Sequence, residues 1–79
     1  MFVYTRKSTY EIWEREDGSA EICHRGGGRV SLLEMKDWVF IPIGVIAKIS
    51  DVKVGERIIF KNNDGKVVRT SLVVEIVQG

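Results

Sequence analysis

Residues 55–77 read GERIIFK (55–61), NNDG (62–65) and KVVRTSLVVEIV (66–77), which is the pattern of a β-hairpin. Two runs rich in β-branched and aromatic residues flank an Asn/Asp/Gly cluster, and Asp and Gly accept the positive φ angles that hairpin turns require. A three-residue loop at 63–65 would pair Phe60 with Val68 and Ile58 with Thr70. The other face of this hairpin would then carry Ile59, Lys61, Val67 and Arg69.

A second hairpin is predicted nearer the N-terminus. Residues 9–15 have strand character, and Glu16-Asp17-Gly18 fits a three-residue loop with Gly at the left-handed position. The register set by this loop places three pairs opposite each other: Glu14 and Ala20, Ile12 and Ile22, Tyr10 and His24. Apolar residues then share one face, and the opposite face has a mixed character, with Glu11, Trp13, Arg15, Glu21 and Cys23. Trp13 is therefore either covered by another part of the protein or open to a partner.

The remaining segments are less regular. Residues 2–4 read as a short first strand, and Gly26-Gly27-Gly28 predicts a mobile loop because three glycines carry a high ordering entropy. Ser31 and Glu34 have the spacing of a capping box, which leaves residues 32–37 as either one helical turn or a strand. Residues 38–41 read as a buried strand, with a bend at 42–44 and a continuation over 45–49.

These segments total six or seven strands in a chain of 79 residues. A chain this short buries its apolar residues and hides its sheet edges most economically by closing the strands into a barrel. We therefore expect an all-β fold, a small antiparallel barrel of six or seven strands, SH3-like or similar. Residues 1–79 would form a single domain.

Composition limits the classes of function. Twelve Lys and Arg against eleven Asp and Glu give a net charge of +1, so there is no bulk basic field of the kind that attracts nucleic acid. Cys23 has no second cysteine to pair with, and the N-terminal residues lack the apolar stretch of a signal peptide, so we expect a cytoplasmic protein. The longest apolar run, residues 38–47, is too short to span a bilayer, and no membrane contact is expected.

Motifs for catalysis are missing from the sequence. Cys23 and His24 are neighbours on a predicted strand, so their side chains point to opposite faces and cannot form a nucleophilic pair. Gly26 to Arg29 lack the Gly-Lys-Ser/Thr ending of a phosphate-binding loop. We therefore expect no enzyme activity, no cofactor and no metal.

The two ends of the chain, TRKSTYE (5–11) and RTSLVVEI (69–76), resemble the two ends of short uncharacterised proteins from phages and mobile elements. The resemblance implies a viral or mobile-element origin. It brings no activity and no site residue with it.

Two functions of different classes remain. The first is a protein-interaction module that binds a partner or self-associates, with an interface on the apolar C-terminal strand at Leu72, Val73, Val74 and Ile76. The alternative is a nucleic-acid-binding barrel that uses basic and aromatic residues of the first third of the chain: Arg6, Lys7, Trp13, Arg15, Arg25 and Arg29. The near-neutral charge favours the first, because phosphate contacts supply most non-specific affinity for nucleic acid.

Overall fold

The computed structural model describes residues 1–78, and within this range the chain forms six strands, one short α-helix and one 3-10 turn. Their bounds are β1 (Phe2–Thr5), β2 (Ser8–Glu14), β3 (Ala20–Gly27), α1 (Leu32–Met35), β4 (Gly44–Ile46), η1 (Ile49–Asp51), β5 (Arg57–Asn62) and β6 (Val67–Val77).

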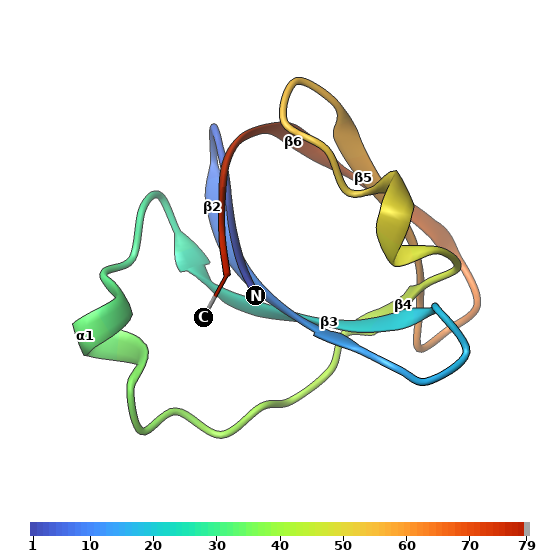
Figure 1. Ribbon diagram of the computed structural model, residues 1–79, viewed down its shortest axis with the longest axis horizontal. Coiled ribbons are helices and arrows are strands. Elements are labelled where there is room, and N and C mark those ends of the chain that lie inside the picture. Colours follow the sequence, from blue (N-terminus) through green and yellow to red (C-terminus); the bar gives the residue numbers. More distant parts are fainter. Residues whose placement is uncertain (79) are drawn as a thin grey trace.

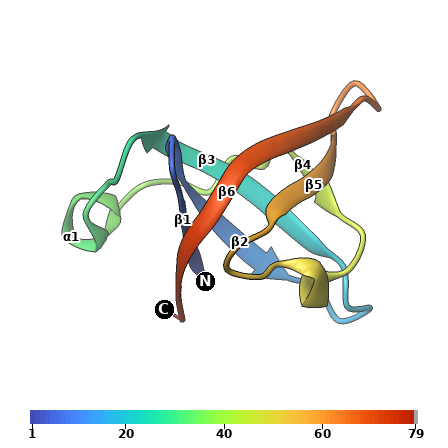
Figure 2. The ribbon, with the colours of Figure 1, turned by 90° about the horizontal axis from the view of Figure 1, so that it is seen from above.

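The strands form a closed antiparallel barrel. Each strand pairs with the next one along the chain, and β6 returns to pair with β1. Figure 1 shows the strands as a ring, and in both Figure 1 and Figure 2 α1 is on a long connection that lies outside the strands. The expectation of a small all-β barrel is confirmed, with six strands among the described residues.

The β2–β3 hairpin has the predicted register. Glu14 pairs with Ala20, Ile12 with Ile22 and Tyr10 with His24. Gly18 closes the turn at a φ of 87°, a left-handed conformation that L side chains rarely adopt. Local turn chemistry and apolar alternation agree here, so the register is strongly specified.

The β5–β6 hairpin departs from the prediction at one position. Phe60 pairs with Val68 as expected, but a bulge lies between Arg57 and Ile59. There the backbone N–H of Ile58 donates to the Thr70 hydroxyl over 3.0 Å, in place of a strand-to-strand backbone bond. Thr70 and Ser71 of β6 lie opposite Ile58 alone, so the extra residue of the bulge is in β6, and it is β6 that bends there.

The barrel core is made of inward-facing aliphatic side chains and one ring. Its buried members are Val3, Ile12, Ala20, Ile22, Ile46, Val52, Ile58, Phe60 and Val73. Gly44 lies against this core, and a Cβ at Gly44 would meet the Lys61 carbonyl oxygen and, at 2.5 Å, the Phe60 ring. The close approach of β4 to β5 therefore requires glycine at this position.

The prediction of a mobile loop at Gly26-Gly27-Gly28 is wrong for its first two residues. β3 continues through Gly27, with Gly26 paired to Thr9 and Gly27 to Ser8. The register shifts between Thr9 and Tyr10, so β2 and β3 stay paired on both sides of a bulge with one extra residue. The partner residues lie far upstream in the sequence, at Ser8 and Thr9, so the local run of glycines does not reveal this pairing.

Residues 28–43 cross the outside of the barrel from β3 to β4, and we call this connection the strap. The capping box is present, because the Ser31 hydroxyl accepts from Leu33 N and the Glu34 carboxylate accepts from Ser31 N, so this segment is a helical turn. The predicted buried strand at 38–41 is wrong: this part of the strap is irregular, and Val39 and Ile41 are 76% and 68% exposed. The predicted continuation at 45–49 is shorter, since β4 ends at Ile46 and η1 follows.

Through residue 78, the structure contains no helix long and apolar enough to cross a membrane.

Candidate functional site

A polar concavity of the barrel lies where the β1–β2 turn meets β6 and the start of β5. Its volume is about 430 Å³. Four of the described residues that line it are basic, and hydroxyl groups and one aromatic ring complete the wall. We call this site the basic pocket; its lining is Arg6, Lys7, Ser8, Tyr10, Arg57, Arg69, Thr70, Ser71 and Leu72.

Backbone hydrogen bonds fix the β1–β2 turn against β6. Arg6 N donates to the Leu72 carbonyl over 3.0 Å, and Lys7 N donates to the Ser71 hydroxyl over 3.1 Å. Within the turn, the Thr5 hydroxyl donates to the Ser8 carbonyl and accepts from Ser8 N. The turn backbone is therefore held in place while the Arg6 and Lys7 side chains remain exposed.

The opposite wall depends on the bulge in β6. Thr70 is buried and accepts from Ile58 N, and its carbonyl accepts from Arg57 Nη1 over 3.2 Å. This contact holds the Arg57 guanidinium over β6 and uses one of its five donors. Arg69 pairs with Ile59 across the hairpin and is exposed.

The cations of the basic pocket are not paired with carboxylates in the described part of the chain, residues 1–78. No Asp or Glu is among the described residues that line it, and none of its four cations takes part in a salt bridge found among residues 1–78. Like charges gathered around one concavity repel each other, and this arrangement does not stabilise the fold. A bound anion would relieve the repulsion and accept charge-assisted hydrogen bonds from the guanidinium groups.

The structure separates the five cations predicted for nucleic acid into two groups. Arg6 and Lys7 lie in the basic pocket. The other cations are paired with carboxylates on the outer surface, Arg15 with Glu21, Arg25 with Glu11 and Arg29 with Glu75. Of the two groups, the pocket group is the one whose cations are free for a ligand.

Trp13 lies on the outer face of β2 and is 54% exposed. Its ring stacks on Phe40 of the strap at 4.8 Å between centroids, and its Nε1 donates to Glu11 Oε2 over 2.8 Å. One ring face is therefore covered by the strap and the other side is open. The cations that neighbour Trp13 in the β2–β3 hairpin, Arg15 and Arg25, are those held in ion pairs.

Arg25 holds the strap against the barrel. It is buried, its Nε donates to Glu11 Oε1 over 2.9 Å, and its Nη2 also contacts that oxygen. From the other side, Nη1 donates to the Val39 carbonyl over 2.9 Å, and the guanidinium lies about 6 Å from the Trp38 and Phe40 rings. Its role in the structure is to anchor the strap.

The four residues predicted for an oligomer interface lie in different environments. Val73 is 2% exposed and belongs to the barrel core, and Ile76 packs against that core. Leu72 lines the basic pocket, and Val74 is 48% exposed. The C-terminal strand is apolar on both faces because it bends between two partners, β5 through Leu72 and β1 from Val73 onward.

Sequence reasoning missed Arg57, Arg69 and the hydroxyl residues of the basic pocket. The hairpin register did place Arg69 on the face away from the core. The missing signal was the closure of β6 onto β1, which brings residues 69–72 beside residues 6–8.

Comparison with known proteins found no match. No protein-family model, no curated protein and no solved structure matches the chain. The resemblance of the chain ends to phage and mobile-element proteins stays a prediction.

Proposed function

We propose that this protein binds single-stranded nucleic acid, with the phosphate backbone held in the basic pocket. The observation that carries the proposal is the gathering of Arg6, Lys7, Arg57 and Arg69 around one concavity whose described lining holds no carboxylate. Guanidinium groups recognise phosphate oxygens in a two-pronged geometry, and the hydroxyls of Ser8 and Ser71 supply further donors.

The size and shape of the pocket favour a single strand. About 430 Å³ is in the range of small-ligand sites, so a phosphate with its sugar and base can enter where a duplex cannot. Tyr10 contributes a ring to the wall, and base stacking on aromatic side chains is the usual second component of single-strand binding. In this proposal Tyr10 takes the stacking role in place of Trp13, with the part of its half-buried side chain that lines the pocket, since the ring also packs against the core and lies edge-on to His24.

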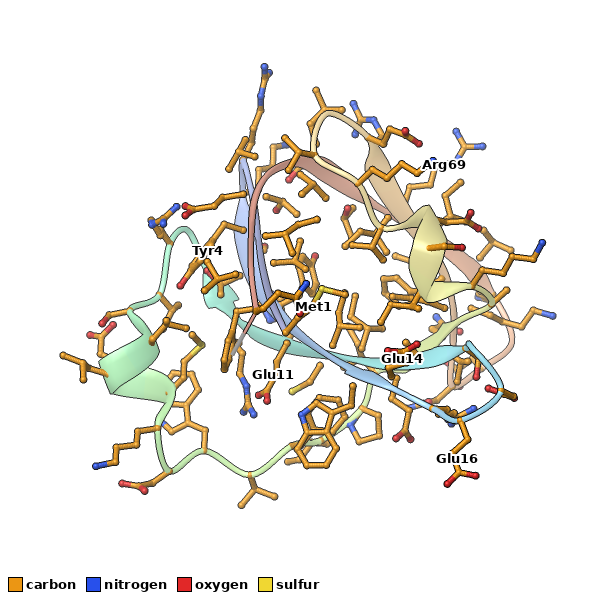
Figure 3. The ribbon with its side chains drawn as sticks, viewed as in Figure 1. Met1, Tyr4, Glu11, Glu14, Glu16 and Arg69 are labelled. Carbon is orange, nitrogen blue, oxygen red and sulfur yellow. The ribbon has the colours of Figure 1, made fainter. Side chains whose placement is uncertain are left out.

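The net charge of +1 is compatible with this function because charge is unevenly distributed over the barrel. Arg6 and Lys7 precede β2, whereas Glu14, Glu16 and Asp17 lie at its other end. Figure 3 shows Arg69 and Glu16 far apart on the barrel. A local field of one sign attracts a polyanion even when the charges of the whole protein cancel.

Fluorescence anisotropy of a labelled oligothymidine tests the proposal. We expect binding at low salt, and the logarithm of the association constant should fall linearly with the logarithm of the salt concentration. The slope should be no steeper than about −2.8, because each of four phosphate contacts contributes about −0.7 on a single strand. Arg6→Ala with Arg69→Ala should weaken binding and reduce the slope by about 1.4. Lys48→Ala, an exposed cation outside the pocket, is the matched control and should bind like the wild type. Equal affinity of the double variant and the wild type would rule the proposal out.

A second candidate function is protein interaction through the strap. Its observation is a set of large apolar side chains that are exposed on this segment: Leu32, Leu33, Trp38, Val39 and Ile41. Exposed apolar patches of this kind mark interaction surfaces, and anchoring by Arg25 holds the segment in one arrangement. Self-association through the strap would persist at high salt and be lost in Leu33→Ser with Val39→Ser, which sedimentation velocity measures. A salt-resistant assembly that survives both substitutions would exclude the strap.

A further inference from the structure

The tip of the β2–β3 hairpin has the opposite charge to the basic pocket. Glu14, Glu16 and Asp17 are exposed there, whereas the charge of Arg15 is compensated by Glu21 over 3.3 Å. η1 packs against this tip through a hydrogen bond from Ile49 N to the Gly18 carbonyl, and its neighbourhood adds one cation and one anion, Lys48 and Asp51, which offset each other. We call residues 14–18 the acidic turn.

The acidic turn is a preorganised projection. Arg15 N donates to the Ser19 carbonyl over 2.8 Å, and Gly18 N donates to the Arg15 carbonyl over 3.1 Å. The Asp17 carboxylate accepts from both the N–H and the hydroxyl of Ser19, at 2.9 and 2.6 Å. Figures 1 and 2 show this turn extending from the ring between β2 and β3. Little ordering entropy is lost when such a turn enters a binding site.

The projection and the concavity of opposite charge lie at opposite ends of β2, so they cannot meet within one molecule. We propose that the acidic turn of a second copy docks into the basic pocket and that nucleic acid competes with it for this site. The contact is head-to-tail, and contacts of this type form rings or open chains. The competition rests on the proposed function, whereas the docking itself does not.

Such an interface is small and depends on exposed charges, so it is weak and sensitive to salt. This dependence distinguishes it from association through the apolar strap, which salt would not dissolve. The self-association predicted from the sequence then involves the two ends of the barrel, with carboxylates of one copy facing guanidinium groups of the next.

Two charge-reversed proteins test the docking. In the turn variant, Glu14→Lys with Glu16→Lys makes both ends of the barrel basic. In the pocket variant, Arg6→Glu, Lys7→Glu and Arg69→Glu leave Arg57 as the one cation of the described lining and make both ends acidic. Asp17 is left unchanged because it stabilises the turn. The matched controls are Asp37→Lys and Lys36→Glu on the strap, which are exposed and outside both ends. Circular dichroism verifies folding, and Glu14→Gln with Glu16→Gln replaces the turn variant if reversal prevents folding.

Sedimentation velocity at about 20 mM salt should give a weight-average mass above the 9.0 kDa monomer that rises with concentration, and the effect should vanish at about 500 mM salt. Each reversed variant alone should remain monomeric, an equimolar mixture of the two should associate again, and both controls should behave like the wild type. A wild type that stays monomeric at low salt, or a mixture that fails to associate, overturns the docking.

Titration with oligothymidine separates this inference from the proposed function. The turn variant keeps the basic pocket, so it should bind the oligonucleotide at least as tightly as the wild type, and the pocket variant should lose binding. In the wild type, added oligonucleotide should lower the weight-average mass toward that of single copies, because each binding event displaces an acidic turn from a pocket. Nucleic-acid binding without any self-association overturns the docking alone, and an assembly that oligonucleotide leaves intact overturns the competition.

Discussion

Replacement of Arg25 by methionine should be the most destabilising change on the outer surface of the barrel. The Arg25 and Glu11 side chains are only 5% and 14% exposed, so the substitution leaves a nearly buried carboxylate without its cation. It also removes the hydrogen bonds that Arg25 donates to the Val39 and Trp38 carbonyls of the strap. Glu11 keeps one partner, the Trp13 indole N–H.

Removing one member of a buried ion pair costs about 3 to 5 kcal/mol in free energy of unfolding. A chain of this length is expected to be stable by about 4 to 12 kcal/mol, so the loss is a large fraction of the total. Each kcal/mol lowers the unfolding midpoint of a small domain by about 4 to 8 °C, which predicts a fall of at least about 12 °C.

Urea unfolding followed by circular dichroism measures the free energy, and the double variant Glu11→Leu with Arg25→Met is the control. Replacing a whole buried pair with apolar side chains is often neutral, so the double variant should recover most of the stability that the single variant loses. A single variant within about 1 kcal/mol of the wild type would refute the anchoring role, because such a small effect is typical of an exposed ion pair.

Three further predictions concern local geometry. Gly44→Ala should destabilise the barrel by about 1 to 3 kcal/mol, since the new Cβ meets the Lys61 carbonyl and the Phe60 ring, and urea unfolding at an unchanged midpoint would contradict it. Gly65→Val should cost about 1 to 2 kcal/mol because Gly65 has a φ of 82°, whereas Gly65→Asn should cost less; equal midpoints in thermal unfolding would argue against strain. Hydrogen bonds from the Ser19 side chain and backbone lower the pKa of Asp17 below 3.8. The ionised carboxylate therefore contributes its full stabilisation at any pH above the ordinary pKa, and this contribution is lost as the pH falls through the lowered pKa. Ser19→Ala should raise the pKa of Asp17 toward the ordinary range, and an NMR titration of the carboxyl carbon that shows no change would disprove the cause.

The two hairpins could be predicted because their information is local. Asp17-Gly18 and Asp64-Gly65 define turns, and apolar alternation on both sides then leaves one register. The strap could not be predicted in the same way. Its apolar residues 38–41 resemble a buried strand, but their carbonyls at Trp38 and Val39 bond to the Arg25 guanidinium and not to a neighbouring strand.

The candidate site was predictable only in part, for the same reason. Arg6 and Lys7 stand out as basic neighbours in the sequence, but Arg57 and Arg69 join them only when β6 closes onto β1. That closure includes a register shift between Tyr4 and Thr5, which no local pattern specifies. A sum of charges over the chain also hides the separation between the two ends, because it gives +1 for any arrangement of the same residues.

The strength of the proposed binding follows from the small number of cations in the basic pocket. Four contacts give a modest, salt-sensitive affinity, and near-zero net charge adds no long-range attraction. A weak site becomes effective when several copies are held close together, because the local concentration of the next site then replaces the bulk concentration. Under the proposed competition, a long strand of nucleic acid would hold copies together in this way, because each pocket that takes up a phosphate releases the acidic turn that covered it. A strand of nucleic acid can displace the turns one after another, since it offers phosphates in the same polymer, whereas each turn is held only by its own contact.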